Sequence, residues 1–112
     1  MAMRRIRSGP LTTLLMSLVL VIGLASSSLA AVGKYGGYSY DGVNIRMYPR
    51  LDSTVMGLGY TSHTSCNVFF EQGDPVNGDP WWLWHGNLTT SVQGYSHESF
   101  MYYNLPYTQC VF

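Results

Sequence analysis

Aromatic residues set the strongest constraint on what this chain can fold into. Nine tyrosines, four phenylalanines and three tryptophans all lie after residue 30, among many glycine, serine, threonine and asparagine residues. No stretch of this region places apolar residues at helical spacing, whereas several short runs alternate apolar and polar residues. We therefore expect an all-β fold for residues 31–112.

The first thirty residues have the composition of a secretory signal peptide. An arginine-rich start precedes an apolar run from Leu11 to Leu24, and Ser28-Leu29-Ala30 places small residues where a signal peptidase reads the chain. The run is shorter than the roughly 20 apolar residues of a membrane-spanning helix, which favours cleavage over an uncleaved anchor. We predict a signal peptide over residues 1–30, cleaved after Ala30 or Ala31. The product would be secreted, extracellular or cell-wall associated, and would meet a membrane only through its signal.

Removal of the signal changes the charge of the protein. The whole chain has six basic and six acidic residues. Three of the bases, Arg4, Arg5 and Arg7, lie in the signal, so three bases remain against six acids and the net charge becomes about −3. Binding to a nucleic-acid backbone needs a basic face, so we expect no nucleic-acid partner.

The chain has only two cysteines, Cys66 and Cys110. In an oxidising compartment we expect them to pair as a disulfide. A domain of about 80 residues would benefit from this crosslink, because a core of that size alone gives only marginal stability. The alternative is two unpaired, buried thiols.

Alternation and turn residues predict five strands, over residues 43–46, 55–60, 65–71, 81–85 and 91–96. Simple alternation places Phe70 on the same face as Cys66 and Val68. Asn77-Gly78 predicts a type I′ hairpin. A helical turn is expected within 98–103, before a short last strand within 105–112 that carries the second cysteine. The Gly/Tyr-rich segment 31–40 is predicted as a flexible lead to a domain over 41–112.

Short motifs recur in a recognisable order along this domain. An aliphatic-Asn-aliphatic-Arg strand precedes a turn with proline, a Ser/Thr-x-Val-x-Gly strand, a tryptophan-centred strand and a Gly-Tyr pair. These features are Val43 to Arg46, Pro49, Ser53, Val55, Gly57, Trp81 to Trp84, Gly94 and Tyr95. Together they resemble the bacterial SH3-like domain. The internal cysteine together with Val76-Asn77-Gly78 and Asn87-x-Thr89-Thr90 resembles the small exported form found in filamentous high-GC Gram-positive bacteria.

The resemblance implies a small SH3-like five-stranded barrel, here with a C-terminal extension tied by the disulfide. It also implies binding to cell-wall peptide or glycan without catalysis. The chain departs from the family pattern at Met47-Tyr48, where Ser-Gly is usual, and at Ser96, where an aliphatic residue is usual. The turn before the second strand and the end of the fifth strand are therefore expected to differ in shape.

Aromatic surplus indicates where a ligand would bind. A domain of this size has core room for only some of its rings, so others must lie at the surface, where tyrosine and tryptophan suit sugar faces and peptide backbones. Alternation places Trp82 and Trp84 on one face, expected to be core, and leaves Trp81 partly exposed. The ligand-binding candidates are Tyr48, Trp81, Tyr102 and Tyr103. The alternative for each is packing at the core or at the edge of the barrel.

No catalytic or metal constellation is evident in the sequence. His63, His85 and His97 lack zinc-ligand spacing, and the consecutive residues Ser96-His97-Glu98 would point to opposite faces of a strand. We therefore expect neither an enzyme nor a cofactor or metal. The leading interpretation is a secreted binding module for cell-wall peptidoglycan. The alternative is a secreted protein-interaction factor, such as an inhibitor or accessory subunit of an extracellular enzyme.

Overall fold

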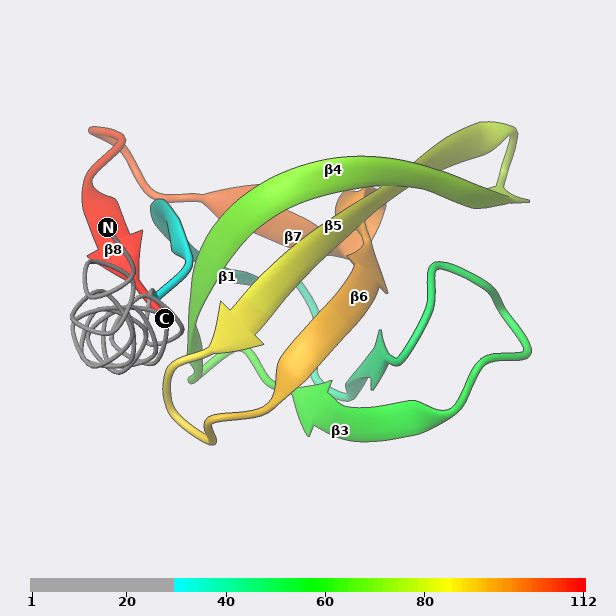
Figure 1. Ribbon diagram of the computed structural model, residues 1–112, viewed down its shortest axis with the longest axis horizontal. Helices are drawn as coiled ribbons and strands as arrows, with labels where there is room; N and C mark the ends of the chain where they lie inside the picture. Colours follow the sequence, from blue (N-terminus) through cyan, green and yellow to red (C-terminus); the bar gives the residue numbers. More distant parts are fainter. Residues whose placement is uncertain (1–29) are drawn as a thin grey trace, which may run out of the picture. The chain divides into compact units, whose positions relative to one another are not determined.

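The computed structural model describes residues 30–112, and it is all-β apart from one turn of 3-10 helix (Figure 1). The predicted signal peptide lies outside the described residues except for Ala30. In chain order the elements are β1 (Val32–Tyr38), β2 (Val43–Arg46), β3 (Val55–Gly59), β4 (Thr64–Val76), β5 (Asp79–Asn87), β6 (Gln93–His97), η1 (Glu98–Phe100), β7 (Met101–Tyr103) and β8 (Gln109–Val111).

The strands form a single antiparallel sheet with the order β3-β2-β6-β5-β4-β1-β7, and β8 pairs with β1 beside this path. The sheet is open, since no ladder joins β3 to β7, and the closed barrel implied by the resemblance is not formed. Figure 1 shows the long strand β4 arching over the twisted sheet. Eight strands form where six were predicted, namely the five and the short last strand, which corresponds to β8. The two additional strands are β1, in the predicted lead, and β7, in the second half of the predicted helical turn over 98–103.

The predicted flexible lead over 31–40 is wrong, because β1 occupies most of it and pairs with β4, β7 and β8. Its glycines serve close packing and not flexibility. A side chain at Gly36 would collide with the backbone oxygen of Tyr102 and the side chain of Asn67. Glycine therefore lets two neighbouring strands approach β1 closely.

The hydrophobic core lies on one face of the sheet, here called the inner face. It consists of Tyr38, Val43, Ile45, Leu83 and Met101, with Val92 packed against them. The opposite, outer face carries Trp82 and Trp84, which were expected to be core. Trp82 is buried beneath neighbouring segments, whereas Trp84 is only half-buried and stacks on another ring.

The predicted disulfide between Cys66 and Cys110 is confirmed, with Cα atoms 5.8 Å apart. It joins β4 to β8, so the C-terminal strand is tied covalently to the middle of the sheet. The predicted hairpin is also confirmed. Asn77 and Gly78 have φ values of 51° and 82°, as a type I′ turn requires.

The face predicted for Phe70 is wrong because the register shifts between Asn67 and Phe69. Before this bulge Asn67 pairs with His85, and after it Phe70 pairs with Leu83, so Asn67 and Phe70 lie on the same face. The extra residue of a bulge reverses the alternation for all that follows. Phe70 therefore shares the inner face with Leu83, and Phe69 moves to the outer face with Cys66.

Candidate functional site

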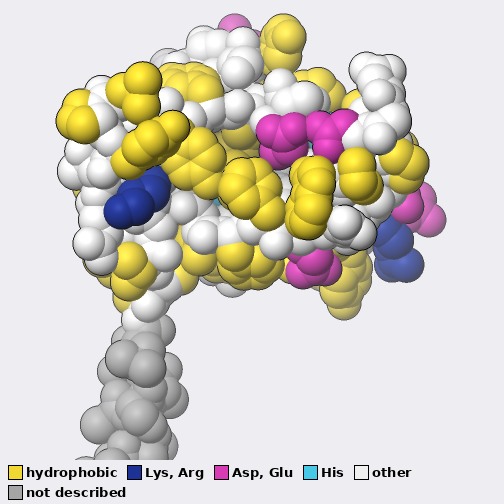
Figure 2. All heavy atoms as spheres, turned by 90° about the horizontal axis from the view of Figure 1, so that it is seen from above, with side chains coloured by type: hydrophobic (Ala, Val, Ile, Leu, Met, Phe, Trp, Pro, Cys, Tyr) yellow, Lys and Arg dark blue, Asp and Glu magenta, His cyan; other side chains and the backbone are white. Residues whose placement is uncertain are grey.

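Hydrophobic side chains are abundant on the surface. Figure 2 shows them in a broken band across one face, with acidic side chains among them. Three of the four candidate rings are exposed, Tyr48 at 52%, Trp81 at 43% and Tyr102 at 43%, and Tyr103 is half-buried. The partial exposure predicted for Trp81 is confirmed.

Trp81 lines a shallow depression of about 350 Å³ with Phe70 and Glu98, which we call the aromatic hollow. Tyr103 adjoins it, because its ring centroid lies 6.4 Å from that of Phe70. Tyr107 extends the row, with its centroid 5.8 Å from that of Tyr103. The structure therefore links two of the predicted binding residues, Trp81 and Tyr103, through Phe70. The sequence pattern predicts Phe70 on the opposite face of the sheet.

The position of Trp81 near the start of β5 explains why its ring is exposed. Trp81 and Leu83 are two residues apart and share the inner face, but only Leu83 reaches the core, with 1% exposure. The β4–β5 hairpin extends beyond the rest of the sheet (Figure 1), so Trp81 continues the apolar face past the point where other strands cover it. Its backbone N–H donates to Asp79 Oδ1 at 3.0 Å, which fixes the start of the strand.

Two carboxyl groups border the aromatic hollow. The side chains of Asp79 and Glu98 share a hydrogen bond, which raises the pKa of Glu98 and lowers the pKa of Asp79. The shared hydrogen bond favours the protonated form of Glu98 and the ionised form of Asp79, which accounts for both directions. Behind them, His97 is buried and its Nε2 lies 2.8 Å from the Asp79 carbonyl oxygen, while its Nδ1 lies 2.7 Å from Ser99 Oγ. These contacts hold η1 against the hairpin.

A second depression, the outer groove, lies on the outer face and has a volume of about 260 Å³. Trp82 and His97 lie in its floor, and both are almost fully buried. Trp82 Nε1 donates to the Asp74 carbonyl oxygen at 2.8 Å, which fixes the indole. Arg46, one of three cations among the described residues, also lines this groove.

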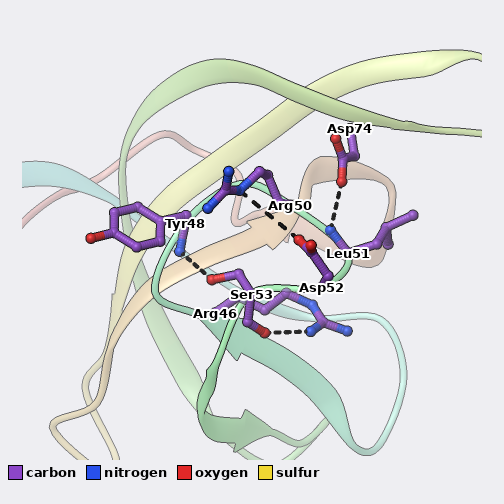
Figure 3. Close-up of polar contacts among 7 residues, drawn as sticks. All are labelled: Arg46, Tyr48, Arg50, Leu51, Asp52, Ser53 and Asp74. Atoms are coloured by element: carbon purple, nitrogen blue, oxygen red, sulfur yellow. Dashed lines mark hydrogen bonds and ion pairs between the residues drawn. The ribbon is translucent and has the colours of Figure 1, made fainter.

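Figure 3 shows the loop between β2 and β3, which closes one side of the outer groove. Ser53 organises it, because its carbonyl oxygen accepts from Arg46 Nη1 at 2.8 Å and its hydroxyl oxygen accepts from the Tyr48 backbone N–H at 2.9 Å. The loop is anchored to β4, where Asp74 Oδ2 accepts from the Leu51 N–H at 2.9 Å. The sequence departure at Met47-Tyr48 thus falls in an ordered, side-chain-braced turn.

Two candidate rings lie outside the aromatic hollow. The Tyr48 ring lies near the guanidinium of Arg50, 5.5 Å from its Cζ. The Tyr102 ring packs over Gly37 on β1. The backbone carbonyl oxygen of Tyr102 accepts a hydrogen bond from Asn67 Nδ2. Within residues 30–112, no ring contact joins either of them to Trp81 or to Tyr103.

The outer face has a further aromatic cluster that the sequence did not indicate. Phe69 stacks on Trp84 at 5.6 Å between centroids and meets Tyr95 edge-on at 6.2 Å. Tyr95 donates its hydroxyl to Glu71 Oε1 at 2.8 Å, and burial is the main cause that raises its pKa to about 12. Phe69 reaches this face only through the bulge, which leaves no signal in the alternation.

The histidines and the polar run after β6 have structural contacts. His85 is fully buried, which lowers its pKa to about 4, and His63 Nδ1 lies 2.9 Å from Asn87 Nδ2. The Ser96 hydroxyl donates to the Asn44 carbonyl oxygen at 2.6 Å and does not contact His97. In the part of the chain that the structure describes, no three His, Cys, Asp or Glu side chains gather as a metal site.

Comparison of the chain with protein-family models, with curated proteins and with solved structures finds no match. Over residues 30–112, the structure contains no helix of the length and apolarity that crossing a membrane requires.

Proposed function

We propose that the protein is a secreted, non-catalytic module that binds glycan of the bacterial cell wall through the aromatic hollow. The proposal combines the motifs that resemble a bacterial SH3-like domain with the signal-peptide pattern of residues 1–30. The disulfide fits a non-reducing compartment, because such bonds persist outside the cytosol.

The observation that carries the proposal is the pairing of exposed rings with carboxyl groups in one depression. Trp81 and Phe70 present apolar surface, with exposed fractions of 43% and 48%, beside Glu98 and its partner Asp79. A sugar has an apolar face of C–H groups ringed by hydroxyls, so it matches rings flanked by hydrogen-bond acceptors and donors. A few polar groups within an apolar depression are what orients a small ligand.

Co-sedimentation with purified peptidoglycan sacculi tests the proposal. The oxidised secreted form, beginning at Ala31, should pellet saturably, and the binding should persist in high salt because no cation lines the aromatic hollow. Trp81→Ala should weaken binding at least about tenfold, as truncation of a central ring commonly does.

Tyr48→Ala is the matched control, since it removes a ring of comparable exposure from the β2–β3 loop. Equal loss in both variants, or loss only in Tyr48→Ala, would move the site away from the aromatic hollow. A folded wild-type protein that stays in the supernatant would contradict wall binding for the wall tested.

A protein-interaction factor is the second candidate, and a specific surface favours it. The edge strand β3 and the loop before it expose a run of apolar side chains, namely Met47, Leu51, Val55, Met56 and Leu58. Exposed apolar surface at an unpaired strand edge is typical of protein contacts. A pull-down from culture medium should then retain a defined protein that the double variant Met56→Ser, Leu58→Ser fails to retain.

A further inference from the structure

The outer groove is a separate site from the aromatic hollow. The short η1 element lies between them, with Glu98 in the aromatic hollow and Phe100 in the outer groove. The groove runs along the outer face of β2, where Asn44 and Arg46 point the same way because they are two residues apart on a strand. A ligand in this groove would therefore not need the surface used by Trp81.

The floor of the outer groove has no free hydrogen-bonding group. The indole N–H of Trp82 is already donated to the Asp74 carbonyl oxygen, and both ring nitrogens of His97 have partners. On one wall Phe100 meets Tyr40 edge-on, with centroids 6.0 Å apart. These surfaces suit an apolar part of a ligand, because desolvating them leaves no polar atom unpaired.

Arg46 supplies an oriented positive charge at the end of β2. Its Nη1 donates to the Ser53 carbonyl oxygen at 2.8 Å, which holds the guanidinium in place. The one ion pair among the described residues joins Arg50 to Asp52, so no carboxylate of that part of the chain neutralises Arg46. A guanidinium has five N–H donors, and those not used by Ser53 match the two oxygens of a carboxylate.

The other end of the outer groove, at the start of β2, has a negative charge. Asp41, just before β2, lines the same groove, and its Oδ1 accepts from the backbone N–H and the hydroxyl of Thr61 at 2.9 and 2.8 Å. These bonds lower the pKa of Asp41 and keep it ionised. The exposed side chain of Asn44 lies between the two charges in sequence and offers both a donor and an acceptor.

We infer that the outer groove binds a short peptide by its free C-terminal carboxylate, which Arg46 holds while an aliphatic or aromatic side chain rests on Trp82 and Phe100. Asn44 pairs with the peptide backbone, and the ionised Asp41 at the far end of the groove favours a peptide with a positive charge beyond the residues held at Arg46. The volume of about 260 Å³ lies below the roughly 300–1,000 Å³ of pockets for drug-sized ligands, which restricts the occupant to very few residues. The inference stands independently of glycan binding at the aromatic hollow.

Nuclear magnetic resonance titration of the secreted form tests this inference. The probes are alanyl-alanine, in its L,L and D,D forms, and L-alanyl-L-phenylalanine, each compared with its C-terminal amide. The free-carboxylate form of at least one probe should saturably shift the indole N–H resonance of Trp82 and the side-chain amide resonance of Asn44. Its amide should bind about tenfold more weakly or worse, the loss expected for a charge-assisted hydrogen-bond pair.

Two substitutions separate Arg46 from a general charge effect. Arg46→Gln removes the charge while keeping a polar N–H donor on a shorter side chain, and it should abolish the preference for the carboxylate. Lys34→Gln removes the same charge from an exposed position on β1 and should leave the preference unchanged. Asn44→Ala is a second test, because the Asn44 side chain takes no part in the hydrogen bonds of the β2–β3 loop. This substitution should weaken the binding of all probes by the same factor.

Three results would overturn the inference. They are equal binding of acid and amide, a preference that survives in Arg46→Gln, and an absence of saturable shifts at Trp82 with every probe. Sedimentation with sacculi is a separate measurement. Loss of wall binding in Trp81→Ala with dipeptide binding intact would keep the two sites distinct, whereas failure of the dipeptide alone would refute only the site in the outer groove.

Discussion

Removal of the Cys66–Cys110 disulfide by the double substitution Cys66→Ala, Cys110→Ala should lower the free energy of unfolding by about 4 kcal/mol. The two cysteines are separated by 44 residues, and the chain-entropy relation for a closed loop of that length gives this value at 25 °C. The loss is large for this domain, since globular proteins are stable by only about 0.05–0.15 kcal/mol per residue.

Urea denaturation followed by tryptophan fluorescence measures the loss. With a slope of about 1–3 kcal/mol per molar urea, the midpoint should fall by more than about 1 M. The slope should also rise, because an unfolded chain without the crosslink exposes more surface. Chemically reduced wild-type protein is the control for packing lost with the sulfur atoms, and it should unfold at a midpoint close to that of the variant.

A loss below about 1 kcal/mol with an unchanged slope would refute this reasoning. It would mean that the unfolded chain already holds β8 near β4, so that the crosslink removes little freedom. A variant that is unfolded without urea would agree with the prediction, provided that a stabilising osmolyte restores its native fluorescence.

Three further predictions concern the core and the carboxyl pair. Leu83→Ala should destabilise the domain by about 2–5 kcal/mol in urea titrations, because Leu83 is 1% exposed at the centre of the core. Burial lowers the pKa of His85 to about 4, so the unfolded chain binds the extra proton and stability should fall as the pH drops from about 6.5 towards 4; His85→Gln should flatten this acid limb. Asp79→Asn should return the pKa of Glu98 towards its ordinary value, which carbon-13 resonances of the carboxyl group would report, since the hydrogen bond to Asp79 is the main cause that raises it.

Much of the strand pattern follows from residue type alone. The strand over Val43–Arg46 matches its prediction because apolar and polar residues alternate cleanly on a strand with one buried face. Asn77-Gly78 correctly predicts the hairpin because both positions need positive φ. The β4–β5 hairpin is nonetheless longer than predicted, since Pro75 and Pro80 lie within strands near the free tip, where a missing N–H is tolerated.

The errors arise where a residue's role depends on a distant neighbour. Gly33 and Gly36 are typical of a flexible segment when read locally, but β4 and β7 approach them too closely for any side chain. The bulge near Val68 is likewise set by pairing with β5 and not by its own sequence. Such long-range constraints are invisible to a single-sequence pattern.

The candidate site was predictable only in part. Period-2 alternation correctly separates Trp81 from Trp82, and the surplus of rings indicates that some lie at the surface. The alternation does not identify Phe70 as the residue that links Trp81 to Tyr103, because the bulge determines which face of the sheet its ring occupies. Nor does it indicate that Arg46 and Asp41 line one groove, since that depends on how the β2–β3 loop folds back.

The two ends of the domain are partners in the same ladder. Ala31 donates its N–H to the Phe112 carbonyl oxygen at 2.9 Å, Phe112 donates back to Ala31 at 2.8 Å, and Val32 pairs with Val111. Since β1 is the first strand to emerge and needs the last one, the sheet cannot be completed until the final residues are available. Under the export proposed above, this order would delay completion of the sheet, and formation of the Cys66–Cys110 disulfide, until the whole domain had crossed the membrane.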